Sequence, residues 1–144
     1  MATEEASLSQ AHSRHERGLI NLCRVLSKYT GRPCLDYYGY GCFCGLGSKG
    51  SHPVDDIDRC CQGHDNCYES LKSSCILRAP YLKPYFMFCK KRECECTDVR
   101  ILKKCAYATC QCDLKFAQCL KNADYNKKYK GFCPKRSRVG RHDD

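Results

Sequence analysis

Apolar residues recur at helical spacing near the beginning of the chain. Leu19, Leu22, Leu26 and Tyr29 follow one another every three to four residues. This spacing places the four side chains on one helix face and predicts an amphipathic helix of about three turns. A Gly-Arg-Pro sequence beginning at Gly31 ends the pattern, because glycine and proline both interrupt helices.

Cysteines take the place of apolar residues in two further helical patterns. One series is spaced seven and eight residues apart, and the other seven and seven. Each series therefore follows one face of a helix, and two antiparallel helices bring the series into register. This register predicts three disulfides, which are Cys60–Cys119, Cys67–Cys112 and Cys75–Cys105.

The stretch between the first two predicted helices is rich in glycine. Five glycines and two cysteines fall within residues 35–50, and this composition predicts a loop rather than a helix. A backbone with so many glycines can turn several carbonyl oxygens toward one point. The simpler alternative is a plain turn.

The remaining segments complete one domain over residues 18–133. Residues 76–104 combine aromatic residues, prolines and closely spaced cysteines, which predicts a loop and a small two-stranded β-hairpin. Residues 1–17 are polar and lack apolar periodicity, which indicates either a pro-segment removed after Arg17 or a tag remnant. Residues 134–144 form a basic tail.

Cysteine content indicates the compartment. The chain has 144 residues, enough for one domain, and 16 of them are cysteines. An even number at this density is typical of disulfide-bonded extracellular proteins. The alternative is a cytosolic zinc or metallothionein-like protein, but zinc sites usually combine two matching pairs of ligands two to four residues apart. The adjacent Cys60 and Cys61 do not fit that plan, so we expect a secreted protein.

The formal net charge of +9 favours anionic partners. Acidic phospholipid headgroups and sulfated polysaccharides are the expected partners of an extracellular protein, and no nucleic acid is expected. The alternative is that the charge serves solubility alone. No apolar run approaches the length that crosses a membrane.

The candidate chemistry lies in the first cysteine-bearing helix, where His64 and Asp65 are adjacent. Cysteines on both sides of His64 fix the orientation of its imidazole, as a general base requires. The antiparallel register brings Asp113 to the level of His64. A carboxylate beside an imidazole fixes its tautomer and stabilises its protonated form, and water can then serve as the nucleophile. The alternative is a buried structural histidine.

A metal site is the second candidate. Backbone carbonyls of the glycine-rich loop and the Asp65 carboxylate are hard oxygen ligands of the kind that calcium prefers. The sequence contains neither an EF-hand loop nor the Gly-Lys-Ser/Thr of a phosphate-binding loop. These observations favour a calcium site of another type.

Together, these motifs resemble the secreted phospholipase A2 family over about residues 18–133. The resemblance is carried by a cysteine- and glycine-rich stretch, a His-Asp stretch, the later cysteine helix and a tyrosine-rich segment, which are residues 40–47, 53–68, 105–113 and 124–129. It implies a mainly α, disulfide-rich fold. Two long antiparallel disulfide-linked helices would be accompanied by an N-terminal amphipathic helix, a calcium loop and a small β-hairpin.

The resemblance also implies a calcium-dependent enzyme that cleaves the sn-2 ester of glycerophospholipids. His64 would be the general base and Asp113 would orient it, while Tyr68 and Tyr85 would donate hydrogen bonds to Asp113. The products would be a free fatty acid and a lysophospholipid. Several members of the family are instead non-catalytic binding proteins. They typically lose the calcium-loop or His-Asp residues that this chain retains, so an enzyme is favoured.

Further roles follow from the same resemblance. The calcium ligands would be the carbonyls of Phe43, Gly45 and Gly47 and the carboxylate of Asp65, with the Gly45 N–H group assisting at the oxyanion. The substrate channel would be lined by Leu19, Leu22 and Leu26. The family framework adds the disulfides Cys44–Cys61, Cys42–Cys133 and Cys96–Cys110, and it leaves open the pairing of Cys23, Cys34, Cys89 and Cys94.

The chain departs from the family pattern in two places. It has one residue more between Gly47 and Pro53, and Ser48 stands where glycine is frequent, which predicts weaker calcium binding. It has no tryptophan, so attachment to a lipid surface would depend on Leu19, Phe86, Met87, tyrosines and the basic surface.

Overall fold

The computed structural model describes residues 18–45, 52–75 and 84–134. The predicted N-terminal extension and residues 135–144 of the basic tail lie outside these ranges. Residues 18–30 are helical. The other elements, in chain order, are η1 (Cys34–Asp36), α2 (Asp56–Glu69), β1 (Met87–Lys90), β2 (Glu93–Cys96), α3 (Lys104–Lys121) and η3 (Lys127–Tyr129). This is the mainly helical, disulfide-rich fold predicted from the sequence.

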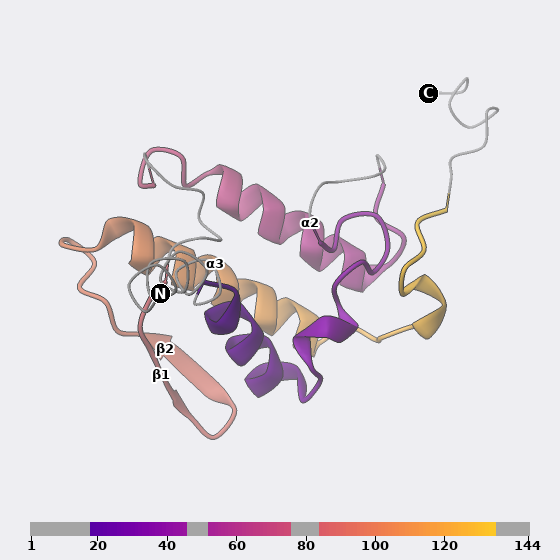
Figure 1. The fold of residues 1–144 in the computed structure, drawn as a ribbon, viewed down its shortest axis with the longest axis horizontal. Coiled ribbons are helices and arrows are strands. Elements are labelled where there is room, and N and C mark those ends of the chain that lie inside the picture. The colour runs from indigo at the N-terminus through magenta and orange to yellow at the C-terminus, as the bar shows by residue number, and fades with distance from the viewer. Residues whose placement is uncertain (1–17, 46–51, 76–83, 135–144) are drawn as a thin grey trace, which may run out of the picture.

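Helices α2 and α3 lie side by side and run antiparallel (Figure 1). The Cα atoms are 5.7 Å apart in both of the disulfides that join them, Cys60–Cys119 and Cys67–Cys112. The third predicted pair, Cys75–Cys105, is also present, but Cys75 does not lie on the helix as predicted. Helix α2 ends at Glu69, and Cys75 reaches its partner from a turn that follows.

Helix α2 begins at a well-formed cap. The side chain of Asp55 accepts a hydrogen bond from the Asp58 backbone N–H at 3.0 Å, which satisfies a donor that the first turn leaves unpaired. The helix then buries Ile57, Cys60 and Cys61. This apolar face packs into the main core. The cap fixes where the helix begins and the core fixes how it is oriented, so together they determine where His64 and Asp65 lie in the folded protein.

The N-terminal helix buries Val25, Leu26 and Tyr29. Its attachment to the hairpin is polar, because the Tyr29 hydroxyl accepts the Cys94 N–H at 3.0 Å and lies 3.3 Å from the Cys94 carbonyl, to which it donates. Leu19 is 40% exposed, so it lies at the edge of the predicted apolar face. The periodicity therefore identified the helix, but it missed Val25.

The predicted hairpin consists of β1 and β2, which pair antiparallel with Cys89 opposite Cys94. These two cysteines form a disulfide across the strands. Cys23 and Cys34 form another disulfide that joins the N-terminal helix to η1. The sequence left the pairing of these four cysteines open. They form two local disulfides, and neither disulfide joins the N-terminal helix to the hairpin.

The C-terminal segment returns to the glycine-rich stretch. Cys133 is bonded to Cys42, and the Gly131 N–H donates to the Gly39 carbonyl at 2.8 Å. The structure also contains Cys44–Cys61 and Cys96–Cys110, the other two disulfides that the resemblance implied. All 16 cysteines are therefore paired. Among the described helices, none is both long and apolar enough to cross a membrane.

Candidate active site

The structure brings His64 of α2 to Asp113 of α3. The distance from His64 Nε2 to Asp113 Oδ1 is 2.7 Å, and the two side chains are 9% and 1% exposed. An ionised carboxylate can only accept, so Nε2 carries the proton of this hydrogen bond. The Nδ1 atom of a neutral imidazole then has the free lone pair, which is the state a general base needs.

Two tyrosines complete the hydrogen bonding of Asp113. The hydroxyl of Tyr68 donates to Oδ1 and that of Tyr85 to Oδ2, each at 2.6 Å. Burial and the neighbouring Asp113 carboxylate raise the pKa of Tyr68 well above its ordinary value of 10.0, and they raise the pKa of Tyr85 in the same way. Both hydroxyls therefore remain donors, and they hold the buried carboxylate in place.

Aromatic rings enclose the imidazole. Phe116 of α3 stacks on His64, with ring centroids 4.2 Å apart and an interplanar angle of 18°. Tyr68 lies against the same imidazole at 4.2 Å and 50°. Phe116 is not among the site residues predicted from the sequence. Its position in the sequence could have identified it, because a residue three places after Asp113 lies on the same side of the helix as Asp113.

Asp65 and the glycine-rich stretch provide the oxygen atoms that could hold a cation. Asp65 is half-buried, and burial raises the pKa of its carboxyl, while His64 lowers it and Asp58 adds to the rise. Within the described ranges no lysine or arginine forms an ion pair with Asp65. A partly buried carboxylate without a lysine or arginine partner fits a hard cation such as calcium. The glycine-rich stretch is tied to the same helix by the Cys44–Cys61 disulfide, one turn before Asp65.

Of the three proposed carbonyl ligands, Phe43 and Gly45 are described and Gly47 lies outside the described residues. Gly45 has a φ of +125°, and a Cβ atom there would lie 3.3 Å from the Gly39 backbone nitrogen. Only glycine adopts this conformation readily, so the backbone shape requires glycine at position 45. The inserted region at 48–51 is also outside the described ranges, while His52 is exposed.

A buried carboxylate that was not predicted from the sequence supports this loop. Asp58 is fully buried and accepts the backbone N–H groups of Cys42, Phe43 and Val54 at 2.8, 2.7 and 2.9 Å. Cys42 and Phe43 lie within the glycine-rich stretch, and Val54 lies just after it. A Cβ atom at Gly41, which has a φ of +59°, would lie 2.5 Å from the Asp58 carboxylate, so any side chain at position 41 would collide with Asp58.

The three leucines that the resemblance assigns to a substrate channel differ in exposure. Leu19 is 40% exposed, Leu22 is partly buried against the core, and Leu26 is 3% exposed within it. The same helix contacts the site through Asn21, whose side-chain oxygen accepts the Tyr85 backbone N–H at 3.1 Å. The N-terminal helix thus helps to position one of the tyrosines that hold Asp113.

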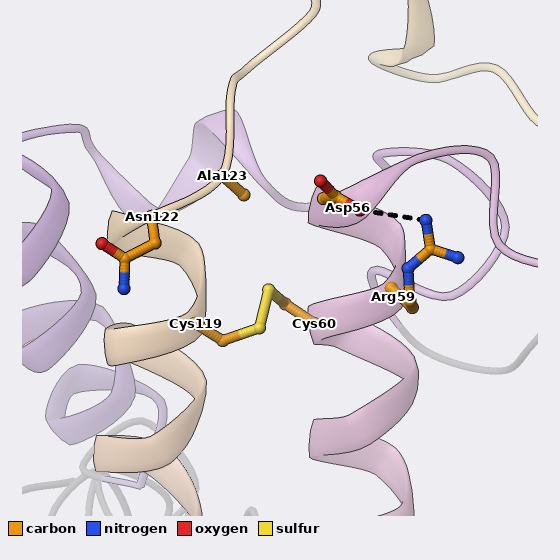
Figure 2. Close-up of a pocket in the computed structure, with 6 residues that line it drawn as sticks. All are labelled: Asp56, Arg59, Cys60, Cys119, Asn122 and Ala123. Carbon is orange, nitrogen blue, oxygen red and sulfur yellow. Dashed lines mark hydrogen bonds and ion pairs between the residues drawn. A yellow bond between two sulfur atoms is a disulfide. The ribbon is translucent and has the colours of Figure 1, made fainter.

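A cavity of about 320 Å³ lies over the Cys60–Cys119 disulfide (Figure 2). It is lined by Asp56, Arg59, Cys60, Cys119, Asn122 and Ala123. Asp56 and Arg59 form an ion pair with each other at 2.9 Å, and none of the candidate site residues lines the cavity. The candidate catalytic and calcium-binding residues therefore lie outside this cavity.

The fold and the site define a small, disulfide-stabilised helical protein. An imidazole–carboxylate pair lies between its two disulfide-linked helices. The family model described as phospholipase A2 matches residues 19–130. The chain is 44% identical over 117 residues to phospholipase A2 A2-actitoxin-Cgg2a of Condylactis gigantea, covering 78% of this chain and 94% of that protein. It is 41% identical over 117 residues to a phospholipase A2 of Bos taurus, covering 78% of this chain and 76% of that protein. The chain belongs to the phospholipase A2 family.

Proposed function

We propose that this protein is a secreted, calcium-dependent phospholipase A2 that hydrolyses the sn-2 ester of glycerophospholipids. The observation that carries the proposal is the 2.7 Å contact between His64 and the buried Asp113. Family membership supports the substrate class, because the similar proteins of Condylactis gigantea and Bos taurus are themselves named phospholipase A2. The eight disulfides support an oxidising, extracellular setting.

In this proposal His64 acts as the general base. Its Nε2 is held by Asp113, so Nδ1 accepts a proton from a water molecule that attacks the ester carbonyl. The Asp113 carboxylate stabilises the imidazolium that forms. Tyr68 and Tyr85 keep that carboxylate fixed through the transfer, because both of its oxygens accept their hydroxyls. The proton then passes from His64 to the leaving oxygen of the glycerol.

Calcium would be held by the carbonyls of Phe43, Gly45 and Gly47 and by the Asp65 carboxylate. When bound, calcium supplies a positive charge that stabilises the substrate phosphate and the oxyanion of the transition state. The Gly45 N–H group would donate to the same oxyanion. The extra residue in the segment before Pro53 makes weaker calcium binding the expectation for this chain.

The substrate would approach along the N-terminal helix. We assign Leu19 and Leu22 to the channel, while Leu26 supports it from within the core because it is almost completely buried. The basic character of the chain, with a formal net charge of +9, supports action on anionic phospholipid surfaces and attraction to sulfated polysaccharides.

A positional assay tests the reaction type. A phosphatidylcholine with different acyl chains at sn-1 and sn-2 is incubated with the protein and calcium, and the products are identified by mass spectrometry. We expect release of the sn-2 chain together with the sn-1 lysophospholipid. Release of the sn-1 chain, or of a phosphorylated headgroup, would exclude a phospholipase A2.

A further inference from the structure

The Cys89–Cys94 disulfide lies across the hairpin, and both of its cysteines are partly exposed. All eight disulfides lie in the described part of the chain, and six of the other seven contain at least one buried cysteine. Among them, Cys23–Cys34 alone shares the partial exposure of both halves. In Figure 1 the hairpin projects away from α2 and α3, with its connecting turn at the free end. A reagent in solution can therefore reach Cys89–Cys94 while the core stays closed.

Strand pairing holds these two cysteines close together. The Thr97 N–H donates to the Phe86 carbonyl at 3.1 Å, so Phe86 and Thr97 are a hydrogen-bonded pair. Hydrogen-bonded and non-hydrogen-bonded pairs alternate along an antiparallel ladder. Cys89 and Cys94 face each other three positions farther along, so they are a non-hydrogen-bonded pair, the type in which opposite Cα atoms lie closest.

The separation at this pair is shorter than a disulfide prefers. The Cα atoms of Cys89 and Cys94 are 3.9 Å apart, whereas disulfides usually hold Cα atoms about 4.4–6.8 Å apart. The corresponding distance in Cys23–Cys34 is 4.9 Å, within the usual range. A bridge outside the preferred range is more easily reduced, so Cys89–Cys94 combines access from solvent with a geometry that favours opening.

The position of Cys94 does not depend on its disulfide. Its backbone N–H donates to the Tyr29 hydroxyl at 3.0 Å, and its carbonyl accepts from the same hydroxyl at 3.3 Å. In a non-hydrogen-bonded pair these backbone groups point away from the opposite strand, which leaves them available to Tyr29. Tyr29 is buried in the main core. Cys94 therefore stays anchored to the N-terminal helix whether or not it is bonded to Cys89.

The base of the hairpin is held by a different bridge. Cys96–Cys110 joins β2 to α3, and its Cys110 half is completely buried. Cys89–Cys94 joins residues only 5 positions apart, so its removal frees little chain entropy, and the backbone ladder still pairs the strands. Opening it should therefore leave the hydrogen bond from Tyr85 to Asp113 in place. The change would be confined to the outer part of the hairpin.

We propose that Cys89–Cys94 is a reversible redox site, which a dithiol reductant opens while the other seven disulfides persist. A thiolate of the reductant attacks one sulfur of the bridge, the S–S bond breaks, and the other sulfur leaves as a thiolate that takes up a proton. The second thiol of the reductant then attacks the mixed disulfide. Two electrons and two protons pass to the protein, which gains two cysteine thiols, and the dithiol becomes a disulfide. This exchange needs no hydrolysis, so it is independent of the proposed function.

Limited reduction of the full chain under native conditions tests the proposal. Increasing concentrations of dithiothreitol are applied, free thiols are trapped with iodoacetamide, and tandem mass spectrometry assigns the labelled cysteines. Near-UV circular dichroism reports whether tertiary packing persists. Before trapping, one portion is treated with oxidised glutathione to re-form the bridge. The variants are Cys89→Ser/Cys94→Ser and its matched control Cys23→Ser/Cys34→Ser, which removes the other bridge with two partly exposed cysteines.

We expect the first labelled species to carry two labels, at Cys89 and Cys94, with most of the near-UV signal retained. This bridge should open at least about tenfold faster than Cys23–Cys34, because reduction relieves its short separation. Oxidised glutathione should restore unlabelled protein. The first step should be absent from Cys89→Ser/Cys94→Ser and unchanged in Cys23→Ser/Cys34→Ser.

First labelling at Cys23–Cys34 would overturn the proposal, and so would first labelling at Cys60–Cys119, where Cys119 is exposed. Exposure alone would then decide which bridge opens. Labelling of several bridges at once with loss of the near-UV signal would also contradict it, because Cys89–Cys94 would then open only when the whole fold opens. Failure of oxidised glutathione to re-form the bridge would exclude a reversible site.

Discussion

The carboxylate of Asp58 accepts the backbone N–H of Phe43 at 2.7 Å, and both residues are buried. The same carboxylate accepts N–H groups from Cys42 and from Val54, on the far side of the glycine-rich loop. One side chain of α2 therefore fixes the backbone on both sides of the loop that carries the proposed calcium ligands. His64 and Asp65 lie on the same helix, so Asp58 links the position of the loop to that of the candidate base.

Asp58→Asn should weaken calcium binding and destabilise the protein. An amide has one carbonyl oxygen where the carboxylate has two, so at least one buried N–H group loses its acceptor, at a cost of about 1–3 kcal/mol. Calorimetry of calcium binding and urea unfolding measure the two effects. Asp56→Asn is the matched control, because it makes the same chemical change at an exposed position in the first turn of α2. Unchanged calcium affinity in Asp58→Asn would show that the loop holds its shape without this carboxylate.

Phe116→Leu should slow catalysis without affecting calcium binding. The substitution keeps an apolar side chain next to His64 but removes the ring that stacks on the imidazole at 4.2 Å. Stacked aromatic pairs contribute about 0.5–1.5 kcal/mol beyond their burial, so kcat/KM should fall about two- to tenfold. Steady-state hydrolysis of vesicles measures the effect, with Phe132→Leu as control. A wild-type rate in Phe116→Leu would mean that Asp113 alone orients His64.

Stability should decline above about pH 10 because of Tyr68 and Tyr85. Burial and the Asp113 carboxylate raise the pKa of both hydroxyls in the folded protein, whereas in the unfolded chain they titrate near 10.0. Above that pH the unfolded state binds fewer protons than the folded state. The free energy of unfolding therefore falls by about 1.4 kcal/mol per pH unit for each tyrosine. Urea unfolding on either side of pH 10 should show a shallower decline in Tyr85→Phe, and an unchanged slope would contradict the assignment.

Removing the Cys42–Cys133 disulfide should cost more stability than removing Cys89–Cys94. The first joins residues 91 positions apart, whereas the second joins residues 5 positions apart. Because the other disulfides remain, the unfolded-chain path from Cys42 to Cys133 runs through Cys44–Cys61 and Cys60–Cys119 and spans roughly 20 residues, so the chain-entropy model gives about 3 kcal/mol for this bridge and about 2 kcal/mol for the short one. Thermal unfolding of the two double serine variants compares these losses. Equal losses would indicate that native-state packing around the bridges, rather than loop length, sets their contribution.

The sequence predicted those parts of the fold that a regular spacing encodes. The cysteine series gave the antiparallel register of α2 and α3, because each helix repeats its face every seven residues. The same register placed Asp113 opposite His64. The series did not reveal that α2 ends at Glu69, because a spacing of eight residues between Cys67 and Cys75 accommodates a turn as well as a helix.

Residues that act through tertiary contacts were not predictable in this way. Asp58 resembles a solvated helix carboxylate until the glycine-rich backbone is seen folded against it. Phe116 has the appearance of an ordinary core residue on α3, and only the packing of α2 places His64 against its ring. The partners of Cys23 and Cys89 could not be predicted either, because several cysteines could close a loop with each of them at a similar cost in chain entropy.

The most direct test of the proposed function is release of fatty acid from anionic phospholipid vesicles, measured with calcium and with excess chelator. The full chain and a chain beginning at Gly18 are compared with His64→Gln, whose fold is checked by circular dichroism. We predict release that requires calcium and is lost in His64→Gln, because the glutamine amide cannot take the proton from water. Release that persists in folded His64→Gln, or that is unaffected by the chelator, would contradict a calcium-dependent enzyme with His64 as its base.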